Sequence, residues 1–398
     1  MSRANQIEPV SSLPPPQKPS VDVLIIAGEH SGDEHAARMV RSLFDINAEA
    51  NVVALGGPEL KTAGANLIFD MMPYAVIGFA EALKRYSAFK ALRDAIVNWV
   101  LEYRPKVVCF VDYPGLNLRV AEILHDKRVT SKSGGSIRLA YYISPQVWVW
   151  KAGRRFKMAR LLDGLGVIFP FEVNSFADTV LDTKFVGHPF LQADYQLPIS
   201  YDSEGDILLL PGSREGPISR IAPTMFSALE RLLTDRGDLQ AKCIYSSTAN
   251  RNLLMELLAK HRAIEGKVEL IANSEKARAR CVLTSSGTMS LNCALAGVPG
   301  AIVYRIHPIT YLLGKALIRI PYIGIANILL DSPLYPEYIQ GAAQPDALKR
   351  ELLDCMENPY RISRAQRGSE KLRKILDQPG GGGAGNWLQA FIEGAAKR

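Results

Sequence analysis

Apolar and polar residues are arranged along the chain so that short buried strands are followed by amphipathic helices. Short apolar runs such as Val21–Ile26, Lys106–Val111 and Ile207–Leu210 are typical of fully buried parallel strands. Between such runs apolar positions recur with the helical period, as in Ala36, Met39, Val40, Leu43 and Phe44. This alternation predicts an α/β fold built on parallel sheets.

The strand–helix alternation occurs twice, which predicts two doubly wound, Rossmann-like domains. A weakly patterned polar link from Phe190 to Gly205 interrupts it. We therefore expect an N-terminal domain over 21–195 and a C-terminal domain over 206–365. Residues 1–20 are polar and Pro-rich and are expected to be a disordered tail. Residues 366–398 contain a flexible linker, Gly380–Gly383, and a short terminal helix, Trp387–Ala396.

Composition narrows the class of protein and its partners. The 398 residues are 47% hydrophobic, carry a net charge of +7 and have a pI near 9.0, which favours an acidic partner. Lys and Arg are spread out and no nucleic-acid motif is present, so we expect phosphates or an anionic membrane surface and no nucleic acid. Five cysteines without a CxxC pair indicate reduced, cytoplasmic thiols. No secretory signal and no apolar run of bilayer length is visible, although the protein could lie on a membrane.

Two turns in the second half have the pattern of anion sites. After Ile207–Leu210 the chain turns through Pro211, Gly212 and Ser213 into a helix, with Arg214 in the turn. A helix N-terminus offers free N–H groups and a positive dipole end, and an Arg fork suits phosphate. The alternative is an ordinary strand–helix turn with a solvated Arg. A second cradle is formed by Ser286, Gly287 and Thr288, for which the alternative is a plain helix N-cap.

The first half has its own candidate chemistry. Glu29, Ser31 and Asp33 follow the first strand, where α/β folds bind ligands, although helix capping explains them as well. Asp112 comes directly after Lys106–Val111 and is a candidate general base, or alternatively a turn Asp before Pro-Gly. The spacing of His30, Glu34 and His35 matches neither HExxH nor HxxEH, so we expect no metal.

Two segments combine apolar residues with several Lys and Arg. Ala75–Leu92 is a basic amphipathic stretch that either lies in a membrane interface or packs on the core with a solvated basic face. Trp148 and Trp150 precede a basic helix that holds Lys151, Arg154, Arg155, Lys157 and Arg160.

Ten ordered motifs between Val21 and Gln340 resemble one family, lipid A disaccharide synthase, a two-domain glycosyltransferase of the B type (GT-B). They are AGEHSGDEHAARMVRSL, VIGFAEALKRY, VDYPGLNLRVAE, YYISPQVWVWKAGRRFKMARLLD, FPFE, FVGHPF, LLPGSREGPISRIAP, SSGTMSLNCALAGVP, YRIHPITYLLGKALIRIPYIGIANIL and PEYIQ. The resemblance implies two Rossmann-like domains facing a cleft.

The resemblance also implies a reaction and a place for it. A 2,3-diacylglucosamine unit moves from its UDP donor to 2,3-diacylglucosamine 1-phosphate with inversion, giving a β-1,6 disaccharide 1-phosphate and UDP, without a metal or cofactor. The implied place is the cytoplasmic face of the inner membrane, with Ala75–Leu92 as the peripheral contact. The terminal helix would pack back on the N-terminal domain, in some relatives that of a partner chain, which raises a homodimer.

Residue roles follow from the same resemblance. Asp112 would be the base that takes the proton of the acceptor hydroxyl. Glu29, Ser31 and Asp33 would line the acceptor side. The UDP contacts would be Ser213, Arg214, Ser286, Gly287, Thr288, Asn292 and Asn327.

The chain departs from the family pattern at three places. Gly115 replaces an Asp, Asn292 replaces a Glu expected at the ribose, and Asp331-Ser332-Pro333 replaces Gly-Arg-Glu. Two alternatives therefore remain: a catalytically silent membrane-surface protein that binds UDP-sugar or lipid, and a UDP-sugar 2-epimerase, which shares the fold but would not need the Ala75–Leu92 surface.

Overall fold

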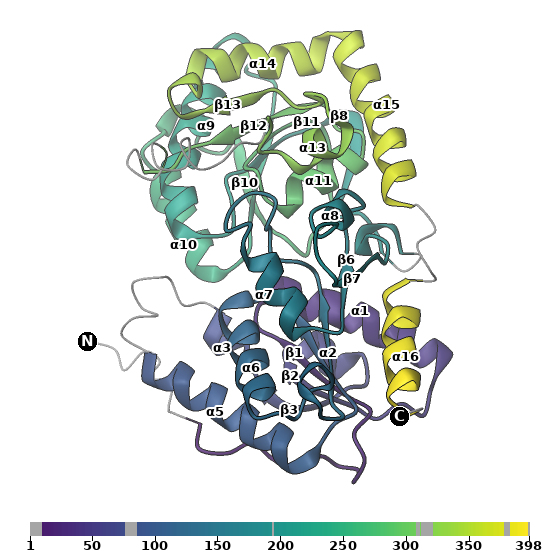
Figure 1. Ribbon diagram of the computed structural model, residues 1–398. Coiled ribbons are helices and arrows are strands. Elements are labelled where there is room, and N and C mark those ends of the chain that lie inside the picture. Colours follow the sequence, from purple (N-terminus) through teal and green to yellow (C-terminus); the bar gives the residue numbers. More distant parts are fainter. Residues whose placement is uncertain are drawn as a thin grey trace, which may run out of the picture. The chain divides into compact units, whose positions relative to one another are not determined.

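The computed structural model describes residues 10–75, 86–192, 195–307, 311, 321–377 and 383–396 (Figure 1). Contacts divide the chain into two compact units. The first contains residues 1–189 together with 378–398, and the second contains residues 190–377. Each unit is a parallel sheet with helices on both faces.

The first unit contains a seven-stranded parallel sheet in the order β3-β2-β1-β4-β5-β6-β7. The chain runs outward from β1 to β3 and then returns to place β4 on the other side of β1. The order therefore reverses between β1 and β4, which is the topological switch point of a doubly wound sheet. The strands are β1 Val23–Ala27, β2 Val52–Gly56, β3 Asn66–Asp70, β4 Val107–Val111, β5 Arg138–Tyr142, β6 Gly164–Val167 and β7 Asp182–Phe185.

Both faces of this sheet are buried because successive side chains of each strand enter different cores. Leu24 and Ile26 of β1 belong to one core, and Val23, Ile25 and Ala27 belong to the other. The helices of the unit are α1 His30–Ile46, α2 Pro58–Thr62, α3 Met72–Ala75, α5 Tyr86–Tyr103, α6 Pro114–Asp126, α7 Arg154–Leu161, α8 Phe171–Asn174 and α16 Gly383–Ala396.

The second unit repeats the arrangement with six parallel strands in the order β10-β9-β8-β11-β12-β13. Its switch point lies between β8 and β11. The strands are β8 Ile199–Leu210, β9 Ala241–Tyr245, β10 Val268–Ala272, β11 Ala277–Thr284, β12 Gly300–Tyr304 and β13 Glu337–Ile339. The helices are α9 Glu215–Asp235, α10 Thr248–Leu258, α11 Thr288–Leu295, α13 Ile325–Leu330, α14 Pro345–Glu357 and α15 Pro359–Leu376.

The doubly wound α/β prediction is confirmed, while several element bounds differ. The link predicted over Phe190–Gly205 holds the first half of β8, which pairs with β11 from Ile199 through shifts in register. This part of β8 contains several polar residues, so the pattern of apolar positions did not predict a strand here. The second unit extends past residue 365, because α15 continues to Leu376. Helix α1 begins at His30 instead of near Asp33.

The terminal helix α16 returns to the first unit and packs beside α1 (Figure 1). Its apolar face joins the core that contains Val23 and Ile25. Gly166 and Gly164 of β6 lie under Trp387 and Phe391, and a Cβ at either glycine would meet these rings at 3.2 and 2.4 Å. The two glycines therefore make room for the aromatic rings of α16. Part of the predicted Gly linker, residues 380–382, lies outside the described residues.

Among the described residues, no helix combines the length and the apolar character needed to cross a bilayer. All five cysteines are buried thiols.

Replacing Trp387 by Ala is expected to destabilise the first unit by about 3 kcal/mol, because a buried aromatic ring leaves a cavity over Gly166. Urea unfolding followed by circular dichroism measures the change. The exposed Tyr360 of α15 provides the control, for which Ala should cost under about 0.5 kcal/mol. Equal effects of the two substitutions would contradict docking of α16 through this ring.

Candidate active site

Two turns meet at the switch point of the second unit. Leu210 at the end of β8 pairs with Thr284 at the end of β11, and the Ser285 N–H donates to the Leu210 carbonyl at 2.8 Å. Gly212 has φ +128, and a Cβ there would lie 3.6 Å from Ser285 Oγ. The turn before α9 and the turn before α11 therefore lie side by side at the carboxyl edge of the sheet.

The turn before α9 is fixed by hydrogen bonds to its backbone, while its side chains are exposed. The Ser213 carbonyl accepts hydrogen bonds from Asn250 Nδ2 at 2.9 Å and Ser246 Oγ at 3.5 Å. Arg214 is the N-cap residue of α9, and the side chains of Ser213 and Arg214 are exposed. Among the described residues Arg214 forms no ion pair. The first-turn N–H groups of α9 and the Arg214 guanidinium are thus available to an anion.

The turn before α11 offers a second set of donors. Gly287 is the N-cap residue of α11 and Thr288 is its first helical residue, and both are exposed. Ser290 Oγ donates to the Gly287 carbonyl at 2.7 Å, which fixes this turn. Ser286 is half-buried. The sequence-predicted residues Ser213, Arg214, Ser286, Gly287 and Thr288 therefore come together around two adjacent helix N-termini.

Asn292 lies one turn into α11 and is buried. Its Oδ1 accepts a hydrogen bond from Tyr195 Oη at 2.9 Å, and its Nδ2 lies 3.6 Å from Met289 Sδ, a weak acceptor. The Tyr195 ring stacks on Phe190 with centroids 4.6 Å apart. Tyr195 thus fixes the direction of the Asn292 amide.

Asn327 has a different environment from the other predicted UDP contacts. Its side chain is fully buried in α13, where Nδ2 donates to the Tyr335 carbonyl at 2.7 Å and to Glu337 Oε1 at 2.8 Å. Its Oδ1 accepts from the Tyr335 N–H at 2.9 Å. The side chain therefore holds α13 to the segment before β13, and its predicted contact with UDP stays a prediction.

The switch point of the first unit brings the loop after β1 against the turn after β4. Ala27 pairs with Val111, and a Cβ on Gly28 would lie 2.3 Å from the Tyr113 ring. Only glycine allows this approach. Burial and then the negative charge of Glu29 raise the pKa of Tyr113 to about 12. Glu29 therefore lies close to the Asp112–Tyr113 turn.

Asp112 occupies a strained and well-anchored turn. Asp112 and Tyr113 have φ of +44 and +46, a left-handed conformation that non-glycine residues rarely adopt. The Asp112 N–H donates to the Tyr142 carbonyl at 3.0 Å, and its carbonyl accepts from Asn117 Nδ2 at 2.7 Å and from the Tyr141 hydroxyl. These bonds fix a half-buried carboxylate residue at the carboxyl end of β4.

Asp33 has a different environment from Glu29 and Ser31. Its carboxylate is buried and accepts the N–H groups of Gly57, Glu59 and Leu60 at 2.8, 3.0 and 3.2 Å. These bonds tie α1 to the start of α2, so Asp33 has a structural role, and its predicted place on the acceptor side stays a prediction. Glu29 is half-buried and Ser31 is exposed, and both remain at the carboxyl edge of the sheet.

Sequence reasoning missed Glu172, a buried carboxyl in α8. Burial raises its pKa to about 8. The Phe169 N–H, which donates to Oε2 at 3.2 Å, lowers the pKa in part. The Trp148 indole N–H, which is near the carboxyl without hydrogen-bond geometry, also lowers it, whereas the negative charge of Asp112 raises it. Glu172 therefore lies within electrostatic reach of Asp112. The available signal was an acidic residue in an aromatic run after a buried strand.

Two histidines are buried beneath the same edge of the first sheet. Burial, followed by the charge of Arg38, lowers the pKa of His35 to about 4. Burial lowers the pKa of His188 to about 3, with further lowering by His35 and Arg38. Both rings are therefore neutral at pH 7. In the part of the chain that the structure describes, no group of three or more His, Cys, Asp or Glu side chains is arranged to hold a metal ion.

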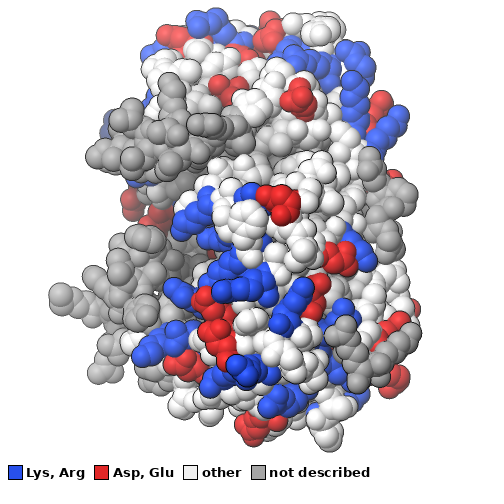
Figure 2. All heavy atoms as spheres, in the orientation of Figure 1, with Lys and Arg blue, Asp and Glu red and all other residues white. Residues whose placement is uncertain are grey.

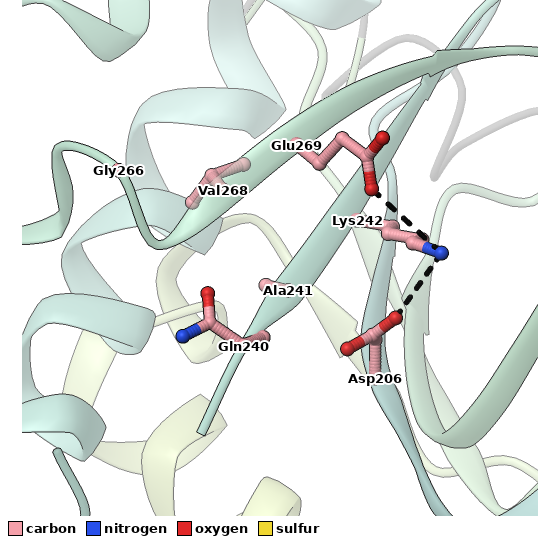
Figure 3. A pocket seen from close by; sticks show the side chains of 7 residues that line it. All are labelled: Asp206, Gln240, Ala241, Lys242, Gly266, Val268 and Glu269. Atoms are coloured by element: carbon pink, nitrogen blue, oxygen red, sulfur yellow. Dashed lines mark ion pairs between the residues drawn. The ribbon is translucent and has the colours of Figure 1, made fainter. Parts of the chain in front are cut away.

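A pocket in the second unit lies at the opposite edge of its sheet (Figure 3). Its lining comes from the amino ends of β9 and β10, the residues just before them, and Asp206 of β8. Lys242 Nζ lies 3.3 Å from Asp206 and 3.7 Å from Glu269, so the charges of the pocket offset one another. Ligands of doubly wound sheets bind at the carboxyl ends of the strands, so this pocket is not the candidate site.

Replacing Glu172 by Gln is expected to change how stability depends on pH. The folded wild type keeps the proton up to about pH 8, whereas the unfolded chain releases it near the ordinary pKa of 4.5. The Glu172 contribution to the free energy of unfolding should therefore fall as pH rises from 4.5 to 8. The Gln variant lacks this loss, so its stability relative to wild type should rise across that window, as measured by urea unfolding. A difference that is constant with pH would show that Glu172 titrates normally.

Comparison with known proteins identifies the family. The family described as lipid-A-disaccharide synthetase matches residues 23–380. The lipid-A-disaccharide synthase of Geobacter metallireducens is 32% identical over 380 residues, which cover 91% of this chain and 94% of the relative. The synthase of Syntrophus aciditrophicus is 33% identical over 371 residues, covering 90% and 94%.

A solved structure shares the fold. It is described as a putative UDP-N-acetylglucosamine 2-epimerase from Listeria monocytogenes, and it aligns with a TM-score of 0.61 at 13% identity, covering 95% of this chain and 97% of that one. This likeness extends to the fold alone, a GT-B arrangement of two parallel sheets. The profile match and the sequence relatives go further, and on them the chain belongs to the lipid-A-disaccharide synthetase family.

Proposed function

We propose that this chain, a glycosyltransferase of lipid A biosynthesis, joins UDP-2,3-diacylglucosamine to 2,3-diacylglucosamine 1-phosphate through a β-1,6 bond. Family membership supports the reaction. The observation that carries the assignment of residues is the pair of switch points, one with two adjacent anion-binding turns and one with the anchored Asp112.

The turns before α9 and α11 are proposed to hold the UDP diphosphate. Backbone N–H groups at two helix N-termini and the Arg214 guanidinium offset its negative charge directly. Ser213, Ser286, Gly287 and Thr288 complete the cradle. This donor set accounts for the charge of the leaving group without a cation, so we expect turnover to persist in EDTA.

Asn292 is proposed to contact the ribose. A carboxylate at this position would only accept hydrogen bonds, whereas an amide donates through Nδ2 and accepts through Oδ1. Tyr195 already donates to Oδ1, so Nδ2 is the group left for a ribose oxygen. In the proposed contact the protein donates the hydrogen bond to the ribose, whereas a carboxylate would accept one. We expect this bond to be weaker than a charge-assisted one.

Asp112 is proposed to be the general base. It accepts the proton of the acceptor 6-hydroxyl while that oxygen forms a bond to the anomeric carbon of the donor sugar. The bond from this carbon to the UDP oxygen breaks on the opposite face, and UDP leaves with the electron pair, so the configuration inverts. Glu29 and Ser31 are proposed to contact the acceptor sugar beside this base.

Both substrates carry acyl chains, which places the reaction at a membrane surface. We propose a peripheral contact through Ala75–Leu92 at the cytoplasmic face of the inner membrane. Residues 76–85 of this segment lie outside the described residues. A homodimer also stays a prediction, for which analytical ultracentrifugation is the test.

Replacing Asp112 by Asn is expected to lower kcat by about 10² to 10⁴, because the acceptor hydroxyl loses its base while the site keeps its shape. The purified proteins are incubated with both lipid substrates in mixed micelles with EDTA, and UDP release and disaccharide formation are followed. The matched control is D126N at the exposed end of α6, which should keep full activity.

Each outcome of this assay has a meaning. Turnover in wild type that collapses in D112N and survives in D126N supports the synthase and its base. Turnover that is unchanged in D112N removes Asp112 from the mechanism. Absence of turnover with retained UDP binding would favour the silent binder, and 2-epimerisation of a UDP-sugar would favour the epimerase.

Replacing Arg214 by Ala is expected to weaken UDP binding by about tenfold or more, since a charge-assisted contact to the diphosphate is lost. Isothermal titration with UDP and with uridine separates the effects: UDP affinity should fall and uridine affinity should hardly change. R220A in the same helix is the control. An equal loss for uridine would place Arg214 away from the diphosphate.

A further inference from the structure

Helix α7 and the loop before it carry a surface that the proposed reaction does not use. We define the α7 patch as Trp150, Lys151, Arg154, Phe156 and Val180. Trp150 and Lys151 lie in the loop, Arg154 and Phe156 in α7, and Val180 between α8 and β7. The Arg155–Asp178 ion pair, at 2.6 Å, holds the Val180 loop against α7.

The patch is unusually apolar for an exposed surface. Among the described residues six large apolar side chains are exposed, and three of them belong to the patch: Trp150 is 53% exposed, Phe156 52% and Val180 85%. Isolated exposed apolar residues are ordinary, whereas a cluster of them marks an interaction surface. The two aromatic rings are the side chains that prefer a membrane–water interface.

The patch also carries positive charge that the chain does not neutralise. Residues 147–162 contain five Lys or Arg and no Asp or Glu. Arg155 pairs with Asp178, and Lys157 and Arg160 lie near Glu122. Lys151 is exposed and Arg154 is half-buried; within the described residues neither forms an ion pair, and both lie over the Trp150 ring, at 4.4 and 5.9 Å. Figure 2 shows Lys and Arg side chains gathered over α7.

The orientation of α7 adds to this charge. Arg154 and Arg155 are its first two residues; Asp178 already pairs with Arg155, so among the described residues Arg154 is the cation left without an ion pair at the positive end of the helix dipole. That arrangement is unfavourable in isolation and is relieved by an anion at the same place. A lipid surface consists of acyl chains beneath anionic phosphates. Exposed aromatic rings suit the boundary of the acyl layer, and cations without an ion pair suit the phosphates.

We propose that the α7 patch docks on an anionic phospholipid surface, with Trp150 and Phe156 entering the interface and Lys151 and Arg154 contacting lipid phosphates. The inference rests on the peripheral membrane contact of the proposed function and adds to it residues outside the segment Ala75–Leu92. A nucleic acid would use the same cations, but base stacking needs a groove that tracks the backbone, and the patch is a helix and two short loops.

The test is co-sedimentation of the full chain with phosphatidylglycerol-containing vesicles and with pure phosphatidylcholine vesicles. We expect wild type to prefer the anionic vesicles and added salt to weaken its binding. W150S/F156S should lower the partition coefficient about tenfold or more. K151Q/R154Q should lower it about tenfold, on anionic vesicles only. The matched controls lie on α15: Y360S for apolar exposure and K371Q/K374Q for charge, and neither should change binding.

A second measurement reports the contact directly. Brominated lipid quenches a tryptophan that enters the interface. Of the four tryptophans Trp150 is the most exposed, because Trp99 and Trp387 are buried and Trp148 is half-buried. Wild-type emission should fall with brominated vesicles, and W150F should lose most of that quenching while it still sediments. This readout does not depend on a second membrane contact elsewhere in the chain.

Vesicle binding without quenching of Trp150, or with unchanged binding of W150S/F156S, would overturn the proposal, as would equal binding to both vesicle types. Binding of an oligonucleotide that needs the same residues would reassign the patch to nucleic acid. Turnover of dispersed substrates separates this proposal from the proposed function. If the enzyme is active and its patch variants bind vesicles normally, only the docking proposal is wrong. If the protein is inactive but docks through the patch, only the proposed synthase reaction is wrong.

Discussion

In each unit the candidate residues depend on the parallel hydrogen bonding of one strand pair, β1 with β4 in the first unit and β8 with β11 in the second. In each pair the crossover helices leave toward opposite sides of the sheet. The turns after the two strands are therefore not covered by a connection between them. Ala27 opposite Val111 and Leu210 opposite Thr284 fix which turn residues become neighbours. A shift of one residue in either register would turn the buried side chains of the strand to the other face, so the core enforces the site.

Strain at the first switch point is concentrated in two residues. Asp112 and Tyr113 both have left-handed backbone, at a cost of about 1 to 2 kcal/mol each. Three hydrogen bonds to the Asp112 backbone offset this cost, and two of them come from β5. Gly28 removes the Cβ that would displace the Tyr113 ring. The backbone of Asp112 is thereby fixed at the carboxyl end of β4.

Much of this arrangement could be predicted from the sequence, and the failures have a common physical origin. Buried strands and the turns after them are local patterns, so the Gly212 turn, the Thr288 helix start and Asp112 were found from the residues around them. The structural role of Asp33 could not be predicted because its partners lie 24 to 27 residues away. The hydrogen bonds of Asn327 could not be predicted because Tyr335 and Glu337 belong to a later segment. Glu172 was missed because its high pKa comes from burial that only the assembled sheet creates.

What separates a supporting polar residue from a ligand-facing one is the hydrogen-bonding capacity that the fold leaves over. A buried polar group is costly unless it is paired, so folding fills its capacity with backbone partners. Asp33 has three bonds to backbone N–H groups, and Asn327 has two to the Tyr335 backbone and one to the Glu337 carboxylate; both residues have almost no exposed surface. Among the described residues Arg214 and Thr288 keep their side-chain donors exposed, next to helix N–H groups that the helix itself cannot satisfy. Folding gains nothing from leaving these donors unpaired and close together. Their position at one edge of a sheet is therefore what we expect of a binding site for an anion.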